Sequence, residues 1–315
     1  MLLFIPNLLL LLFDVANADN GKPVIVIVPG AWTTAEQFAP VISSLQSKGY
    51  TAVANTLPSI NSTNPSADTI ATDAEFYREG FFCPLIDGEG KDVILMTHSY
   101  GGVPGNIAIQ GLSKVERAAR GQKGGVIGMI LLASFTLKEG QALITVLPNG
   151  EWLPWWQGQV RAHVSSPPFE DVPVIHVLTS LSQNNKQQIS ISTPKPTFFN
   201  DVDDATAAPF IVELGWQSYS TFTSLPAAPA WADNERYTNR RVYIKTLRDT
   251  ALDPVAQDGL REGTDVAWNL KTIDSGHCPF STQPDNLAQM VVDSIEGFQK
   301  LGPNKRRHVR KIYLN

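Results

Sequence analysis

A short apolar run ends in a serine-containing turn at Val93-Ile94-Leu95-Met96-Thr97-His98-Ser99-Tyr100-Gly101-Gly102. This pattern predicts a buried strand, then a sharp turn with Ser99 at its tip, and then a helix. Such a nucleophile elbow holds the serine hydroxyl clear of the sheet, and the N–H of Tyr100 can donate to a developing oxyanion. Gly101 and Gly102 supply the small residues needed where the helix packs on the strand. The stretch predicts that Ser99 is a catalytic nucleophile, although serine is also a common helix N-cap.

A serine hydroxyl attacks well only when a base removes its proton, and in folds built on this turn the acid and then the base follow the serine. Of five histidines, His277 has the fitting context, because it follows the strand-like segment 266–273. Gly276 lets the loop turn, and Pro279 stiffens it. We therefore expect His277 to be the base. The other histidines lie inside the turn, in an expected lid or in a basic tail: His98, His163, His176 and His308.

The acid should follow the strand-like segment 241–246, and two aspartates come next, Asp249 and Asp253. Asp253 precedes Pro254, and an Asp N-cap followed by proline is a common helix start. Asp249 has no such local role, and it lies where the first turn after the strand would aim a carboxylate at the sheet edge. We favour Asp249 as the residue that orients His277, with Asp253 as the alternative.

A tetrahedral intermediate needs a second N–H donor. The apolar segment 24–28 runs into Pro29-Gly30-Ala31-Trp32, where Gly30 allows close approach of the backbone. Ala31 N–H is therefore the expected second donor beside Tyr100 N–H. Pro-Gly after a strand is also an ordinary turn signal, so the assignment depends on Ser99.

Four motifs together resemble an α/β-hydrolase: Pro29-Gly30-Ala31-Trp32, Gly49-Tyr50-Thr51-Ala52-Val53 with Leu57-Pro58-Ser59, His98-Ser99-Tyr100-Gly101-Gly102, and Ser275-Gly276-His277-Cys278-Pro279-Phe280. Over about residues 22–300, the chain is most similar to the compact branch of plant methylesterases, hydroxynitrile lyases and related microbial esterases. Phe198-Phe199-Asn200-Asp201 and Trp231 resemble the cap of microbial members. The chain departs from the usual pattern at Pro29, where a histidine is common, and at Thr97, where a glycine is common.

The resemblance implies a Ser99–Asp249–His277 triad with Ala31 and Tyr100 as the oxyanion hole. It implies a serine hydrolase that cleaves a carboxylic ester of a small to medium apolar substrate through an acyl-enzyme. Two alternatives stay open. The first is a lyase of the hydroxynitrile-lyase type, in which Ser99 and His277 act as acid and base. The second is a non-catalytic ligand-binding member of the fold, because fold does not settle function.

Strand-like segments alternate with helix-like ones along most of the chain. The expected strands are 23–28, 51–55, 92–97, 126–133, 241–246 and 267–272. The expected helices are 34–48, 66–82, one from the serine-containing turn to about 119, and 284–300. This order predicts an α/β fold with a mostly parallel sheet covered on both faces. The alternation stops over about 136–239, where we expect an inserted lid. Its tryptophans could line a substrate pocket or form the lid's own core.

The composition and net charge of the chain limit the classes of partner that it could bind. The 315 residues are 43% hydrophobic and carry a net charge of −5, and the five basic residues of the tail 301–315 leave 20 basic against 30 acidic residues elsewhere. An acidic body argues against nucleic-acid binding. Cys83 and Cys278 do not make a disulfide framework and are expected to be unpaired. No cysteine or histidine cluster suggests a metal, and no cofactor is expected. The expected partner is a small-molecule ester, and the sequence does not predict an oligomeric state.

The N-terminus is typical of a targeting segment. Residues 2–13 are almost wholly apolar, and Ala16-Asn17-Ala18 offers small residues at a cleavage site. We expect residues 1–18 to be a secretory signal peptide and the protein to be secreted, with no stable membrane insertion. No lysine or arginine precedes the apolar run, so an apolar extension on a cytoplasmic protein is the alternative.

Overall fold

The computed structural model describes residues 21–151, 153–158 and 187–301. At its centre is a six-stranded sheet in the order β2-β1-β3-β4-β8-β9, in which every neighbouring pair is parallel. The strands are β1 (Val24–Val28), β2 (Ala52–Ala54), β3 (Asp92–His98), β4 (Gly125–Leu132), β8 (Arg241–Thr246) and β9 (Asn269–Ile273). Strands β1 and β4 are buried throughout, as expected for parallel strands covered on both faces. The predicted α/β fold is confirmed.

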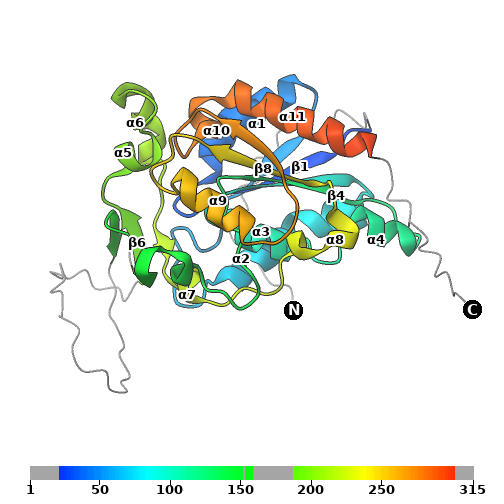
Figure 1. Cartoon of the computed structure of the whole chain (residues 1–315), viewed down its shortest axis with the longest axis horizontal. Coiled ribbons are helices and arrows are strands. Elements are labelled where there is room, and N and C mark those ends of the chain that lie inside the picture. Colours follow the sequence, from blue (N-terminus) through cyan, green and yellow to red (C-terminus); the bar gives the residue numbers. More distant parts are fainter. Residues whose placement is uncertain (1–20, 152, 159–186, 302–315) are drawn as a thin grey trace, which may run out of the picture.

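Helices cover both faces of the sheet (Figure 1). One face carries α1 (Ala39–Ser47), α10 (Pro279–Thr282) and α11 (Pro284–Lys300), and the other carries α2 (Ile70–Tyr77), α3 (Gly102–Ala108) and α4 (Lys114–Ala119). Helix α9 (Pro254–Glu262) follows β8 in the chain, and the short helix α8 (Asn234–Tyr237) precedes β8. Within the described ranges, no helix has the length and apolar character needed to span a bilayer.

Two of the expected helices are wrong in detail. The helix expected from the turn to residue 119 is two helices, because Gly111 adopts a left-handed backbone (φ +75°) and Ser113 caps α4 by accepting from Glu116 N at 3.1 Å. The helix expected over 66–82 begins at Ile70 and continues past Tyr77 as two wider π-helical turns, Arg78–Phe82 and Pro84–Gly88. Proline in the second turn has no N–H to donate, so a regular α-helix cannot continue through it.

The part of the chain between β4 and β8 is here called the inserted segment (136–239); its last helix, α8, lies beside α4, and its strand β6 (Gln188–Ile191) lies at the other side of the main sheet (Figure 1). Its described residues form a small antiparallel sheet of β5 (Trp156–Gly158), β6 (Gln188–Ile191) and β7 (Gln217–Ser218), with helices α5 (Pro194–Phe198), α6 (Asp204–Val212) and α7 (Ser220–Thr223). The expected signal peptide, the tail beyond Leu301, and His163, His176 and Trp152 lie outside the described residues.

Trp32, in the loop after β1, fastens the inserted segment to the main sheet. Its Nε1 donates to Ile189 O on β6 at 2.8 Å, and its carbonyl accepts from Gly215 N at 2.8 Å. Its ring packs, with centroids 5.4 to 6.0 Å away, on four aromatic rings of the inserted segment: Trp155, Trp156, Phe198 and Phe222. Trp156 is therefore part of the inserted segment's own core, whereas Trp216 is 44% exposed.

Gly128 in β4 gives a direct test of the packing between the sheet and α11. A Cβ at this position would lie 2.4 Å from the ring of Phe298, which is itself buried. Because that ring is held between strand and helix, Gly128→Ala is expected to lower the free energy of unfolding by about 1–3 kcal/mol, the usual cost of overpacking. Gly297→Ala in α11 is the control, since its Cβ would meet no atom within 4 Å and alanine favours helix. Chemical denaturation of both variants measures the difference, and equal stabilities would contradict the described packing.

Candidate active site

Ser99 lies at the tip of the turn that follows β3. Its backbone has φ +50°, in the left-handed region that a non-glycine residue rarely adopts. Gly101 makes the turn possible, because a Cβ there would lie 2.3 Å from Pro29 O and 2.4 Å from Val28 O. The loop after β1 is therefore pressed against the turn that carries Ser99. Ser99 therefore lies on a strained turn between a strand and a helix, the geometry that its sequence predicts.

The loop after β1 reaches Ser99 itself. A Cβ on Gly30 would lie 2.8 Å from Ser99 Cβ, so only glycine fits there. The loop turns tightly, since Thr33 Oγ1 donates to Gly30 O at 2.9 Å and Trp32 has φ +62°. Ala31 follows directly after this contact and is 3% exposed. The structure thus brings Gly30, the residue before Ala31, against Ser99 from a segment about 70 residues away in the chain.

Asp249 and His277 are joined by a hydrogen bond. His277 Nδ1 lies 2.7 Å from Asp249 Oδ2, and both side chains are buried. The carboxylate also accepts four further hydrogen bonds, at 2.8 to 3.2 Å, from Ala251 N, Leu252 N, Thr246 Oγ1 and Gln257 Nε2. Because the carboxylate only accepts, His277 Nδ1 carries the proton and Nε2 is left as the basic nitrogen.

Asp253, the alternative acid, has a different role. Its Oδ1 accepts from Val255 N at 2.9 Å and from Ala256 N at 3.0 Å, as the N-cap of α9. The predicted helix start at Pro254 is confirmed. Of the two aspartates, the structure places Asp249 at the histidine.

His98 connects the turn that carries Ser99 (residues 98–101, the serine turn) to the loop that carries His277 (residues 274–278, the histidine loop). Its Nε2–H donates to the main-chain carbonyl of His277 at 3.0 Å, and the two imidazole centroids are 4.5 Å apart. Its Nδ1 has no hydrogen-bond partner within the described part of the chain and faces Gly30, where a Cβ would lie 2.7 Å away. Burial, with the nearby His277, holds the pKa of His98 well below its usual value, so His98 stays neutral. His98 therefore supports the histidine loop. No hydrogen bond between Ser99 Oγ and His277 is present among the described residues.

The inserted segment contacts the histidine loop directly. The ring of Phe198 lies 4.9 Å from the His277 imidazole, and Ser275 Oγ donates to Asp201 Oδ2 at 2.9 Å. Gly276 has no room for a side chain, because a Cβ would lie 2.3 Å from Asn200 Oδ1. Residues 198–201 thus form one wall beside the imidazole. Among the described residues, no group of three or more His, Cys, Asp or Glu side chains could hold a metal ion.

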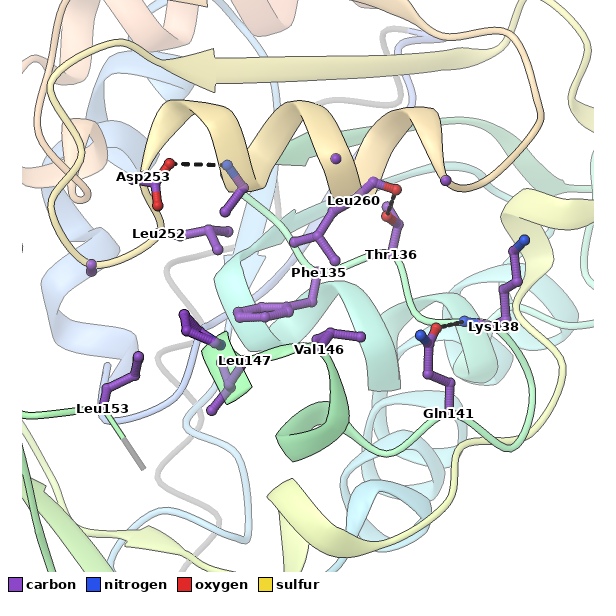
Figure 2. Close-up of a pocket in the computed structure, with 15 residues that line it drawn as sticks. Phe135, Thr136, Lys138, Gln141, Val146, Leu147, Leu153, Leu252, Asp253 and Leu260 are labelled. Carbon is purple, nitrogen blue, oxygen red and sulfur yellow. Dashed lines mark hydrogen bonds between the residues drawn. The ribbon is translucent and has the colours of Figure 1, made fainter. Parts of the chain in front are cut away.

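A cavity of about 420 Å³ lies between α9 on one side and residues 135–148 and Leu153 on the other (Figure 2). Its lining includes Phe135, Leu147, Leu153, Leu252 and Leu260, with Lys138 and Gln141 at one end. Ser99 and His277 are not among its lining residues. Its walls are nevertheless tied to the site, because Leu252 N donates to Asp249 and Phe135 N donates to Ser99 O at 3.0 Å.

Several supporting residues escaped the sequence reasoning. Thr246 and Gln257 hold the Asp249 carboxylate, Trp32 anchors the inserted segment, and the Tyr100 side chain bonds Asp73 on α2. Thr246 ends strand β8 three residues before Asp249, so its place in the sequence could have indicated a contact with the Asp249 carboxylate. Gln257 and Asp73 act only after helices fold back against the sheet, so no local pattern marks them.

Comparison with known proteins matches residues 25–290 to the family model described as alpha/beta hydrolase family. The chain is 26% identical over 270 residues to alpha/beta hydrolase nvfD of Aspergillus novofumigatus, covering 86% of this chain and 95% of that protein. It is 25% identical over 278 residues to probable hydrolase R7 of a Phoma species, covering 86% and 98%. Among solved structures, a methylesterase from Arabidopsis has a TM-score of 0.57 at 20% identity, covering 87% of this chain and 99% of that one.

Proposed function

Because the chain belongs to the alpha/beta hydrolase family, we propose that it hydrolyses carboxylic esters with Ser99 as nucleophile, His277 as base and Asp249 as the acid. The observation that carries the proposal is the 2.7 Å hydrogen bond from His277 Nδ1 to the fully buried carboxylate of Asp249. That bond leaves Nε2 to act as the base, on a loop that His98 ties to the serine turn.

The proposed reaction has two halves. His277 Nε2 takes the Ser99 hydroxyl proton while Oγ attacks the ester carbonyl, and the oxyanion receives hydrogen bonds from the N–H groups of Ala31 and Tyr100. The protonated imidazole then gives its proton to the leaving alcohol, and an acyl-enzyme remains. In the second half, His277 activates a water that releases the acid. Asp249 holds the imidazole in one tautomer and stabilises the imidazolium.

The substrate class proposed is a small to medium apolar ester. Phe198 beside His277 continues into the aromatic cluster around Trp32, which includes Trp155 and Trp156. A substrate group held next to His277 would meet the Phe198 ring, and an aromatic surface favours apolar groups. The expected export of the protein remains a proposal from its N-terminal sequence alone.

The experiment that tests this function is a partition measurement. Three butyrate esters with different leaving alcohols are hydrolysed in buffer containing methanol, and butyric acid and methyl butyrate are quantified. A shared acyl-enzyme predicts the same acid-to-methyl-ester ratio for all three, because each reaches the same intermediate. A ratio that changes with the leaving alcohol contradicts the acyl-enzyme. Cleavage of a cyanohydrin without ester turnover would instead support a lyase.

A further inference from the structure

The side chain of Tyr100, next to the nucleophile, ends on a buried carboxylate. Tyr100 OH donates to Asp73 Oδ2 at 2.7 Å, and both residues are 1% exposed or less. Ser59 gives the same carboxylate two more hydrogen bonds, from its N at 3.1 Å to Oδ1 and from its Oγ at 2.6 Å to Oδ2. Three neutral donors therefore converge on one carboxyl group of α2.

A buried carboxyl group without a cation among its hydrogen-bond partners is costly to keep. Burial raises the pKa of Asp73 to about 7, against the lowering effect of its hydrogen bonds from Ser59 and Tyr100. Removing a charge from water costs free energy unless strong partners replace the solvent. Stability alone therefore does not explain an aspartate at this place, and its contact with the serine turn offers a reason.

The same carboxylate is connected to the inserted segment through Ser59. Gln217 Nε2 on β7 donates to Ser59 Oγ at 2.9 Å, and Ser218 N donates to Ser59 O at 2.9 Å. Ser59 and Asp73 thus join the serine turn on one side and β7 on the other. The turn needs such support, because Ser99 holds a strained left-handed backbone immediately before Tyr100.

We propose that Asp73 is a positioning residue for the reaction: by holding the Tyr100 hydroxyl, it fixes the Tyr100 backbone N–H where the oxyanion forms. The proposal rests on the proposed esterase function. A tyrosine anchored at its hydroxyl and at its backbone cannot rotate away, so its N–H keeps one direction. Preorganised donors of this kind stabilise the transition state more than the bound substrate.

Asp73→Asn and Tyr100→Phe test the proposal. Losing a complete oxyanion donor costs about 10²–10³ in kcat, so a donor that is only misplaced should cost about 10–100-fold. We expect this loss in kcat with KM changed less than about twofold, the pattern of an interaction made in the transition state. The inhibition constant of phenylboronic acid, which forms a tetrahedral adduct on serine, should rise by a similar factor. The double variant should lose little more than either single one.

Tyr77→Phe is the matched control. Tyr77 lies on the same helix, is fully buried, and donates to Ile27 O at 2.9 Å without touching the serine turn. It should lower the melting temperature and leave kcat unchanged. If Tyr100→Phe keeps wild-type kcat and wild-type affinity for phenylboronic acid, the proposal is wrong, even if Asp73→Asn fails to fold. If the wild type hydrolyses esters and Ser99→Ala does not, but Asp73→Asn and Tyr100→Phe keep full activity, only the proposal for Asp73 is wrong. If the wild type does not hydrolyse esters, the proposed function and the proposal for Asp73 are both wrong.

Discussion

Ser99→Ala is expected to lower kcat for ester hydrolysis by about 10⁶, to near background, while the protein keeps its fold. The loss is large because the proposed acyl-enzyme forms on the Ser99 hydroxyl, and the neighbouring His98 is a neutral residue bonded to a main-chain carbonyl. Alanine can occupy the φ +50° position at a cost close to that of serine, so the melting temperature should change little.

Ser294→Ala is the control for removal of a buried serine hydroxyl. Ser294 lies in α11, and its Oγ donates to Met290 O at 2.6 Å, away from the serine turn. It should keep full activity. Turnover by Ser99→Ala within tenfold of wild type would contradict the assignment of the nucleophile, provided that a parallel preparation from cells that do not express the protein shows no esterase activity.

Asp249→Asn is expected to lower kcat by about 10⁴. Two main-chain donors, Ala251 N and Leu252 N, hold the Oδ1 side of the group, so an asparagine should place its amide oxygen there. Its NH₂ then faces His277 Nδ1, and the imidazole must accept at Nδ1 and carry its proton on Nε2. That tautomer cannot take a proton from Ser99. Stability should fall slightly, because Gln257 Nε2 loses an acceptor at 3.2 Å.

Asp253→Ala provides the contrast. It removes the cap that accepts from Val255 N and Ala256 N, so the free energy of unfolding should fall by about 1 kcal/mol with kcat unchanged. Denaturation midpoints and kcat for both variants decide the matter. Activity lost in Asp253→Ala but kept in Asp249→Asn would show that the acid is assigned to the wrong aspartate.

The features that the sequence predicted well depend on neighbours in the chain. Strand β8 and helix α11 have the expected bounds, 241–246 and 284–300, and the Asp253 cap follows from the proline after it. The serine turn was visible because its strand, its tip and its glycines lie within ten residues. In this type of fold the acid and then the base follow the serine in the chain, and this order left Asp249 or Asp253 as the acid and His277 as the base.

The features that the sequence did not predict depend on contacts across the fold. Tyr100 and Asp73 are 27 residues apart, and Trp32 and Ile189 are 157 apart, so no periodicity connects them. The break between α3 and α4 depends on Gly111 and Ser113, which a continuous helical pattern conceals. Within the inserted segment, aromatic content indicated a core but not which rings would meet Trp32.

Covalent labelling of the serine hydroxyl shows whether Ser99 is the nucleophile. Wild-type protein, Ser99→Ala and Ser294→Ala are treated with a fluorophosphonate, digested, and mapped by mass spectrometry. If Ser99 is the nucleophile, we expect one adduct, on Ser99, in the wild type and in Ser294→Ala, and no adduct in Ser99→Ala. An adduct on another residue in the wild type, or labelling that persists in folded Ser99→Ala, would contradict this assignment.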